Sequence, residues 1–236
     1  MSGPHLHPLR RFLRRILPAV VTLALTATLA VALQVREVRV LGAQRFPARD
    51  VETVLRAALG SPTIATRAGA LRAGVRAVPW VADATVRVSL DGVVTCLLVE
   101  REPVAIAVDE GICWLVDREG RLLATVDSSS PLPRLEGFAS FPEERSTLLA
   151  ARPALERAWG ASIESAKRLG PHDVALHFGD TSPPVLADPG RPEELVAARR
   201  VFAAWTAKRP VPLRLDARLV GRVAVLPAPI ASKGEP

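Results

Sequence analysis

Residues 78–105 decide the fold, and they read VPWVADATVRVSLDGVVTCLLVEREPVA. Pro79 ends a preceding helix, and we expect Trp80 beside it to be buried where the chain enters a strand. β-Branched residues are frequent on both sides of Asp91-Gly92, a pair that tolerates the positive φ of a two-residue hairpin turn. The stretch therefore predicts a β-hairpin. Its second strand ends in a charged triplet at 100–102, which we interpret as a solvated strand end.

Two amphipathic helices and a strand are predicted upstream of this hairpin. Residues 47–59 carry apolar side chains at i, i+3, i+4, i+7 and i+8, and residues 66–78 repeat the helical pattern. Residues 35–40 alternate in the manner of a strand. The order is therefore β-α-α-β-β in about 70 residues, which is enough for one small core. We expect Trp80 to pack in this core with three aliphatic side chains, Leu55, Leu71 and Val86.

Taken together, these features resemble the POTRA domain of FtsQ/DivIB-type bacterial cell division proteins. The resemblance is carried by the strand that ends at Gly42, the two helices, Pro79-Trp80-Val81, the hairpin, and EREPVA at residues 100–105. The chain departs from the family in the hairpin turn, where Leu90-Asp91-Gly92 stands in place of a turn that usually contains proline. The resemblance implies a POTRA domain over residues 35–104.

The segment before this domain predicts a membrane anchor. Residues 1–15 hold four arginines and no acidic residue, and residues 16–34 hold no charged residue. A helix from 16 to 33 would be about 27 Å long, close to the hydrocarbon thickness of a bilayer. The arginines would form a cytoplasmic tail by the positive-inside rule, which places the rest of the chain in the periplasm. The alternative is a signal peptide cleaved near Ala30-Val31-Ala32, and both interpretations export the chain.

The second half of the chain predicts another α+β unit with a mostly antiparallel sheet, over residues 105–226. Helices are expected at 143–159, where Pro153 should break or kink the helix, and at 193–205. Short strands are expected at 106–108, 112–116, 121–126, 163–169, 174–178 and 185–187 and within 211–225. The resemblance to the family continues here through LVD at 115–117, LPRLEG at 132–137 and LDAR at 215–218. Residues 227–236 lack a periodic pattern, and we expect a disordered tail.

Composition and motifs argue against several functions. The net charge is +7, but four of these charges lie in the N-terminal tail, so the excess does not suggest a nucleic-acid-binding face. The sequence has no catalytic or metal-binding motif, and we expect no enzyme activity, no cofactor, no metal and no small-molecule substrate. Cys96 and Cys113 lie in apolar strands, where we expect two buried free thiols.

The predicted function is therefore binding. The family resemblance implies a single-pass scaffold of the division machinery in the inner membrane, at the septum, that binds FtsB-like and FtsL-like membrane proteins. We expect the partner to add a strand to the final strand of the second unit. The candidate site residues are Arg218, Leu219, Val220, Gly221, Arg222, Val223, Ala224 and Val225. The alternative function is a secreted periplasmic chaperone or transport adaptor that takes up peptide strands through its POTRA domain.

Overall fold

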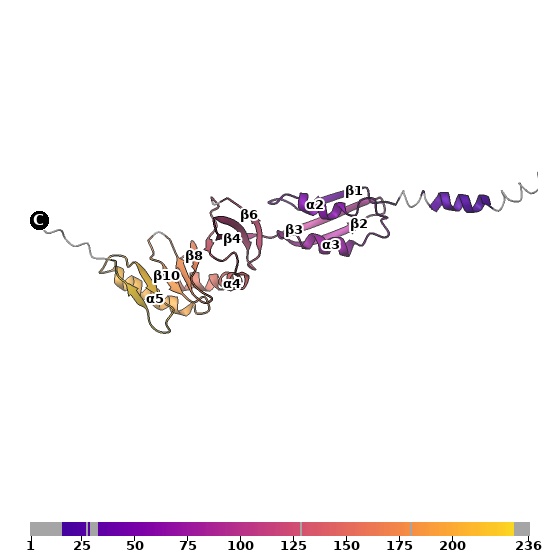
Figure 1. Ribbon diagram of the computed structural model, residues 1–236. Helices are drawn as coiled ribbons and strands as arrows, with labels where there is room; N and C mark the ends of the chain where they lie inside the picture. Colours follow the sequence, from indigo (N-terminus) through magenta and orange to yellow (C-terminus); the bar gives the residue numbers. More distant parts are fainter. Residues whose placement is uncertain (1–15, 27, 29–32, 128, 180, 229–236) are drawn as a thin grey trace, which may run out of the picture. The chain divides into compact units, whose positions relative to one another are not determined.

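The computed structural model divides into two compact units, Met1–Glu100 and Arg101–Pro236 (Figure 1). The structure describes residues 16–26, 28, 33–127, 129–179 and 181–228. The predicted basic tail at 1–15, part of the predicted membrane helix and most of the predicted C-terminal tail lie outside these residues. Residues 16–26 form a helix. Among the described residues, no helix combines the length and the hydropathy needed to cross a membrane.

The first unit has the predicted β-α-α-β-β order. Its elements are β1 (Glu37–Leu41), α2 (Arg49–Arg56), α3 (Ala68–Arg76), β2 (Val81–Val88) and β3 (Val93–Glu100). The strands form a sheet in the order β1-β3-β2, in which β1 runs parallel to β3 and β2 runs antiparallel to it. Side chains alternate along β3, so that Cys96 and Leu98 are buried while Leu97 and Val99 are exposed.

The hairpin between β2 and β3 has three loop residues, so the predicted two-residue turn is wrong. Val88 pairs with Val94, and the N–H of Ser89 donates to the carbonyl of Val93 at 2.9 Å. The loop between them is Leu90-Asp91-Gly92. Gly92 has a φ of 89°, and a Cβ there would lie 2.5 Å from the carbonyl oxygen of Gln34. Glycine is therefore required by the conformation and by the close approach of the chain before β1.

Trp80 is buried with 3% of its surface exposed, as predicted. Its indole ring stacks on Phe46, with ring centroids 5.4 Å apart. Phe46 was not among the expected neighbours, because it lies in the loop between β1 and α2 and belongs to no periodic pattern.

Glu100 anchors the same loop, which corrects the interpretation of this residue as part of a solvated strand end. Its carboxylate accepts hydrogen bonds from the backbone N–H groups of Gln44, Arg45 and Phe46, at 2.9–3.1 Å. Burial alone would raise the pKa of Glu100, but these three donors stabilise the carboxylate and lower the pKa overall. The end of β3 therefore fixes the loop that carries Phe46 to Trp80.

The second unit forms one mixed sheet of nine strands, in the order β12-β11-β10-β9-β8-β7-β4-β5-β6. Its elements are β4 (Pro103–Asp109), β5 (Ile112–Asp117), β6 (Leu122–Thr125), β7 (Arg134–Glu136), α4 (Pro142–Trp159), β8 (Ser165–Arg168), β9 (Val174–His177), β10 (Val185–Ala187), α5 (Glu193–Thr206), β11 (Arg214–Asp216) and β12 (Ala224–Leu226). Most neighbours are antiparallel, but β4-β7, β7-β8 and β10-β11 are parallel. Strand β7 was not predicted, although it joins the two halves of the sheet.

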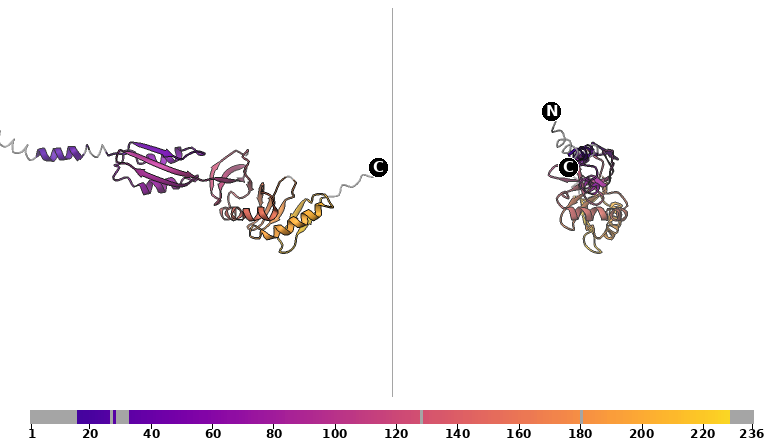
Figure 2. Two further views of the ribbon diagram at one scale, coloured as in Figure 1. Left: turned by 180° about the vertical axis from the view of Figure 1, so that it is seen from behind. Right: turned by 90° about the vertical axis from the view of Figure 1, so that its right-hand side faces the viewer.

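Helices α4 and α5 pack side by side on this sheet (Figure 2). The core between helices and sheet is continuous, and Trp159 in it stacks on Phe178 and Phe202 with centroids 5.0 and 5.7 Å apart. Helix α4 runs through Pro153, so the expected break does not occur. Apolar residues of α4 are buried on both sides of the proline, and this packing offsets one lost backbone hydrogen bond.

A buried arginine joins the start of α4 to the hairpin of β5 and β6. Only 4% of Arg145 is exposed, and its guanidinium donates to the carbonyls of Gly120, Phe138 and Ala139 at 2.6, 2.7 and 2.7 Å. Burial lowers the pKa of Arg145, and the nearby carboxylate of Asp117 partly opposes this effect.

Both cysteines of the chain are buried and free, as expected.

Candidate partner-binding edge

The predicted site residues lie at one end of the nine-stranded sheet, but only two of them belong to a strand. Strand β12 covers Ala224–Leu226, whereas residues 218–223 form the turn that joins β11 to β12. The expectation of one strand from Arg218 to Val225 is therefore corrected. Strand β12 is the terminal strand of the sheet, and among the described residues no further strand pairs with it.

The pairing of β11 shows which backbone groups of β12 point toward the open edge. Leu215 and Ala217 donate their N–H groups to the carbonyls of Pro184 and Leu186, so these two residues face β10. Because successive residues of a strand face opposite sides, Arg214 and Asp216 face β12, where they pair with Leu226 and Ala224.

Val225, between these two pairs, then directs its N–H and carbonyl to the open edge. The edge therefore offers an exposed donor and acceptor at this residue.

The side chains of this region alternate as predicted. Val223 and Val225 pack against the core, while Ala224 is exposed. Leu226 was missed because the predicted segment stopped at Val225, and 47% of its surface is exposed. The turn adds Leu219 and Val220, which are 58% and 70% exposed. An aliphatic surface thus borders the open edge, and continuing the alternation by one residue would have found Leu226.

The two arginines of the predicted site have different surroundings. Arg218 forms a bidentate ion pair with Asp216, at 2.7 and 2.9 Å, and a second ion pair with Asp173 at 3.0 Å. The hydrogen bonds that Arg218 donates to Asp216 raise the pKa of Arg218 and lower the pKa of Asp216. Arg218 therefore fixes the turn. Arg222 is exposed and is the better placed of the two for a partner.

Helix α5 also fixes this turn, through a residue that sequence reasoning missed. The carboxylate of Glu194 accepts a hydrogen bond from the backbone N–H of Gly221, at 3.0 and 3.2 Å to its two oxygens. Glu194 lies 27 residues earlier in the sequence, so no local pattern connects the two.

Within the described residues, no group of three or more histidine, cysteine or acidic side chains is arranged to hold a metal ion.

The fold defines a protein with a POTRA-like first unit and a second unit that ends in an open strand edge suited to binding. Comparison with protein families gives the class of the first unit. Residues 33–101 match the model of the FtsQ-type POTRA domain, so the chain carries a POTRA domain of the FtsQ type. The resemblance of this domain to the POTRA domain of FtsQ/DivIB-type division proteins is thereby confirmed.

Comparison with curated proteins gives no match. Among solved structures, the chain is similar to the major extracytoplasmic domain of the trans isomer of the bacterial cell division protein DivIB from Geobacillus stearothermophilus. The identity is 16%, the TM-score is 0.32, and the match covers 47% of this chain and 98% of the other. A TM-score of this size does not bear on function.

Proposed function

We propose that the protein is a single-pass scaffold of the bacterial division machinery, which binds FtsB-like and FtsL-like proteins and couples septal assembly to peptidoglycan synthesis. The observation that carries this proposal is the FtsQ-type POTRA domain at residues 33–101. The uncharged segment 16–34 behind four arginines supports an inner-membrane anchor, with the two folded units in the periplasm.

The open edge of β12 supports a binding mechanism. A partner segment in extended conformation would pair with Val225 through main-chain hydrogen bonds and continue the sheet. Its side chains would meet the exposed aliphatic residues Leu219, Val220 and Leu226, and an acidic residue would meet Arg222. The main-chain hydrogen bonds would then contribute affinity for any extended segment, and the contacts with these side chains would select among such segments.

The test is a proline scan of β12 in the full-length protein. Val225→Pro removes the outward N–H and should weaken binding of the FtsB-like partner at least about tenfold. Ala224→Pro instead removes an N–H that faces β11, so it should lower stability. Arg222→Glu should weaken binding, whereas Arg118→Glu, outside this edge, should not. Normal partner binding by a folded Val225→Pro variant and by Arg222→Glu would exclude this edge as the docking site.

The cellular role is tested by depletion and fractionation. Depleted cells should form filaments with unsplit septa, and the protein should stay in the inner membrane after a high-salt wash. Normally dividing cells would contradict the division role. Recovery of a soluble protein that starts near Leu33 would favour a secreted chaperone or transport adaptor.

A further inference from the structure

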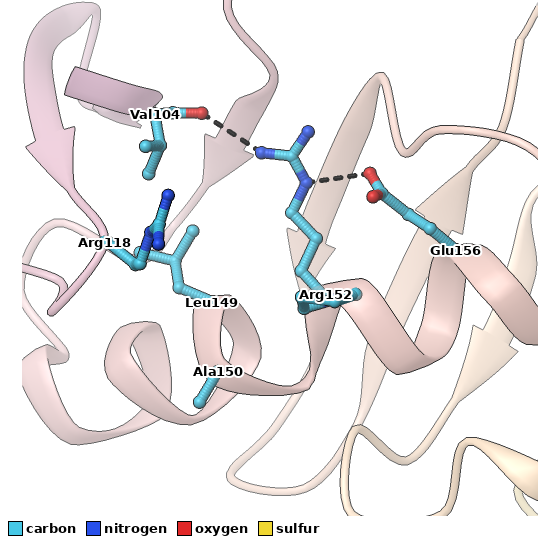
Figure 3. Close-up of a pocket in the computed structure, with 7 residues that line it drawn as sticks. Val104, Arg118, Leu149, Ala150, Arg152 and Glu156 are labelled. Atoms are coloured by element: carbon cyan, nitrogen blue, oxygen red, sulfur yellow. Dashed lines mark hydrogen bonds and ion pairs between the residues drawn. The ribbon is translucent and has the colours of Figure 1, made fainter. Parts of the chain in front are cut away.

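A pocket of about 390 Å³ in the second unit lies away from the candidate edge. It is lined by the start of β4, the turn between β5 and β6, and the middle of α4, through Val104, Arg118, Leu149, Ala150, Arg152, Pro153 and Glu156. Figure 3 shows the guanidinium of Arg118 beside Leu149, and that of Arg152 between Val104 and Glu156. The volume is at the lower end of the range for ligand pockets and suits two or three residues of a peptide.

The pocket has an excess positive charge. Arg152 donates to the carboxylate of Glu156 at 2.8 Å, so the charges of Arg152 and Glu156 compensate each other. Arg152 also donates to the carbonyl of Val104 at 3.1 Å. Arg118 is exposed, and among the described residues no carboxylate forms an ion pair with it. Its neighbour Glu119 is 3.3 Å from Arg101. A ligand that brings a carboxylate to Arg118 would therefore supply the missing charge.

A helix carbonyl at a residue that lines the pocket lacks its usual donor. In a helix, the carbonyl of Leu149 would accept the N–H of the residue four positions later, which here is Pro153. Proline has no N–H, so this hydrogen bond is absent and the carbonyl is left for another donor. Leu149 and Pro153 both line the pocket. A peptide N–H is a donor that can enter beside an aliphatic side chain.

We infer that this pocket is a second protein-binding site, which takes a short extended segment of a partner protein with an acidic side chain next to an aliphatic one. The acidic side chain pairs with Arg118, the aliphatic side chain lies against Val104 and Ala150, and a backbone N–H donates to the carbonyl of Leu149. The site is independent of strand addition at β12, and it gives the scaffold a place for a second partner.

The first experiment is a selection from a displayed library of random linear peptides against the full-length protein in detergent, with Val225→Pro present in the parent and in every variant. This substitution removes strand addition at the β12 edge, which would also take an acidic residue beside aliphatic ones. Parallel selections use Arg118→Glu and, as the matched charge control, Arg222→Glu. The parent and Arg222→Glu should enrich peptides with an acidic residue beside an aliphatic one, and Arg118→Glu should not. Enrichment of a motif without an acidic residue, or of the same motif by Arg118→Glu, overturns the inference.

The second experiment measures the affinity of a synthetic peptide with the selected motif by fluorescence anisotropy. Arg118→Glu should weaken binding at least about tenfold, because a charged hydrogen bond is lost and repulsion replaces it. Pro153→Ala restores the N–H that the carbonyl of Leu149 lacks, so it should raise thermal stability and still weaken binding about threefold to tenfold.

A purely structural role of Pro153 would not combine higher stability with weaker binding. Unchanged affinity in both variants overturns the site. Because the edge variant Arg222→Glu is measured with the same peptide, failure here is distinguishable from failure of strand addition at β12.

Discussion

Arg145→Met should destabilise the second unit while keeping much of the side-chain volume. The substitution removes the donor to three carbonyls, of which those of Gly120 and Phe138 are buried and that of Ala139 is partly buried. Leaving two buried acceptors without a donor costs about 1–3 kcal/mol each, or about 2–6 kcal/mol together. The variant no longer buries a guanidinium, which offsets part of this loss. We therefore expect a net loss of about 2–4 kcal/mol.

The assay for this variant is hydrogen exchange in the full-length protein, read at the amides of β6 and α4. It reports local opening free energies, which is suitable because a chain with two units need not unfold in a single transition. Arg157→Met is the matched control, since Arg157 is exposed on the same helix and should change stability by less than about 0.5 kcal/mol. A loss below about 1 kcal/mol for Arg145→Met would show that the carbonyls find other donors.

Three further predictions concern the first unit. Trp80→Ala should cost about 3–5 kcal/mol in denaturant unfolding, and a melting temperature within a degree or two of the parent would contradict the buried packing. Glu100→Gln should cost about 1–2 kcal/mol at neutral pH. Because folding lowers the pKa of Glu100, its stabilisation is present above the unfolded-state pKa and is lost as the pH falls through the folded-state value. The cost measured by a pH series of unfolding curves should therefore shrink in acid, and a pH-independent cost would contradict the ionic role. Gly42→Ala should cost more than about 1 kcal/mol, since φ is 92° and the new Cβ would lie 2.4 Å from the carbonyl oxygen of Leu98. Gly69→Ala in α3, where a Cβ meets open space, should be neutral or stabilising by the same measurement.

The first unit was predictable from sequence because its elements are local. The helices at α2 and α3 and the strands at β2 and β3 each bury one face, and a buried face leaves a periodic pattern that can be read without knowing the neighbours. The length of the hairpin loop was not predictable in this way. It depends on Gly92 lying against the carbonyl of Gln34, a contact between segments far apart in the chain.

Local sequence patterns were not sufficient to predict the whole of the second unit. Strand β7 has three residues, Arg134–Glu136, which is too short for any period, yet it lies between β4 and β8 in the sheet. Helix α4 continues through Pro153 because its apolar residues are buried on both sides. Local preference was overridden in both places by packing that only the complete sheet and core provide.

The candidate edge was likewise predictable from the sequence only in part. The sequence by itself determined that Val223, Ala224 and Val225 follow Arg218 and Arg222, and that Val223 and Val225 share a face of a strand. Only the tertiary structure decided that β12 is the terminal strand, that the backbone of Val225 points outward, and that Arg218 is held by Asp216 and Asp173. Alternation is a property of one strand, whereas the order of strands, the direction of each N–H and the partner of each charge depend on which distant segments pair.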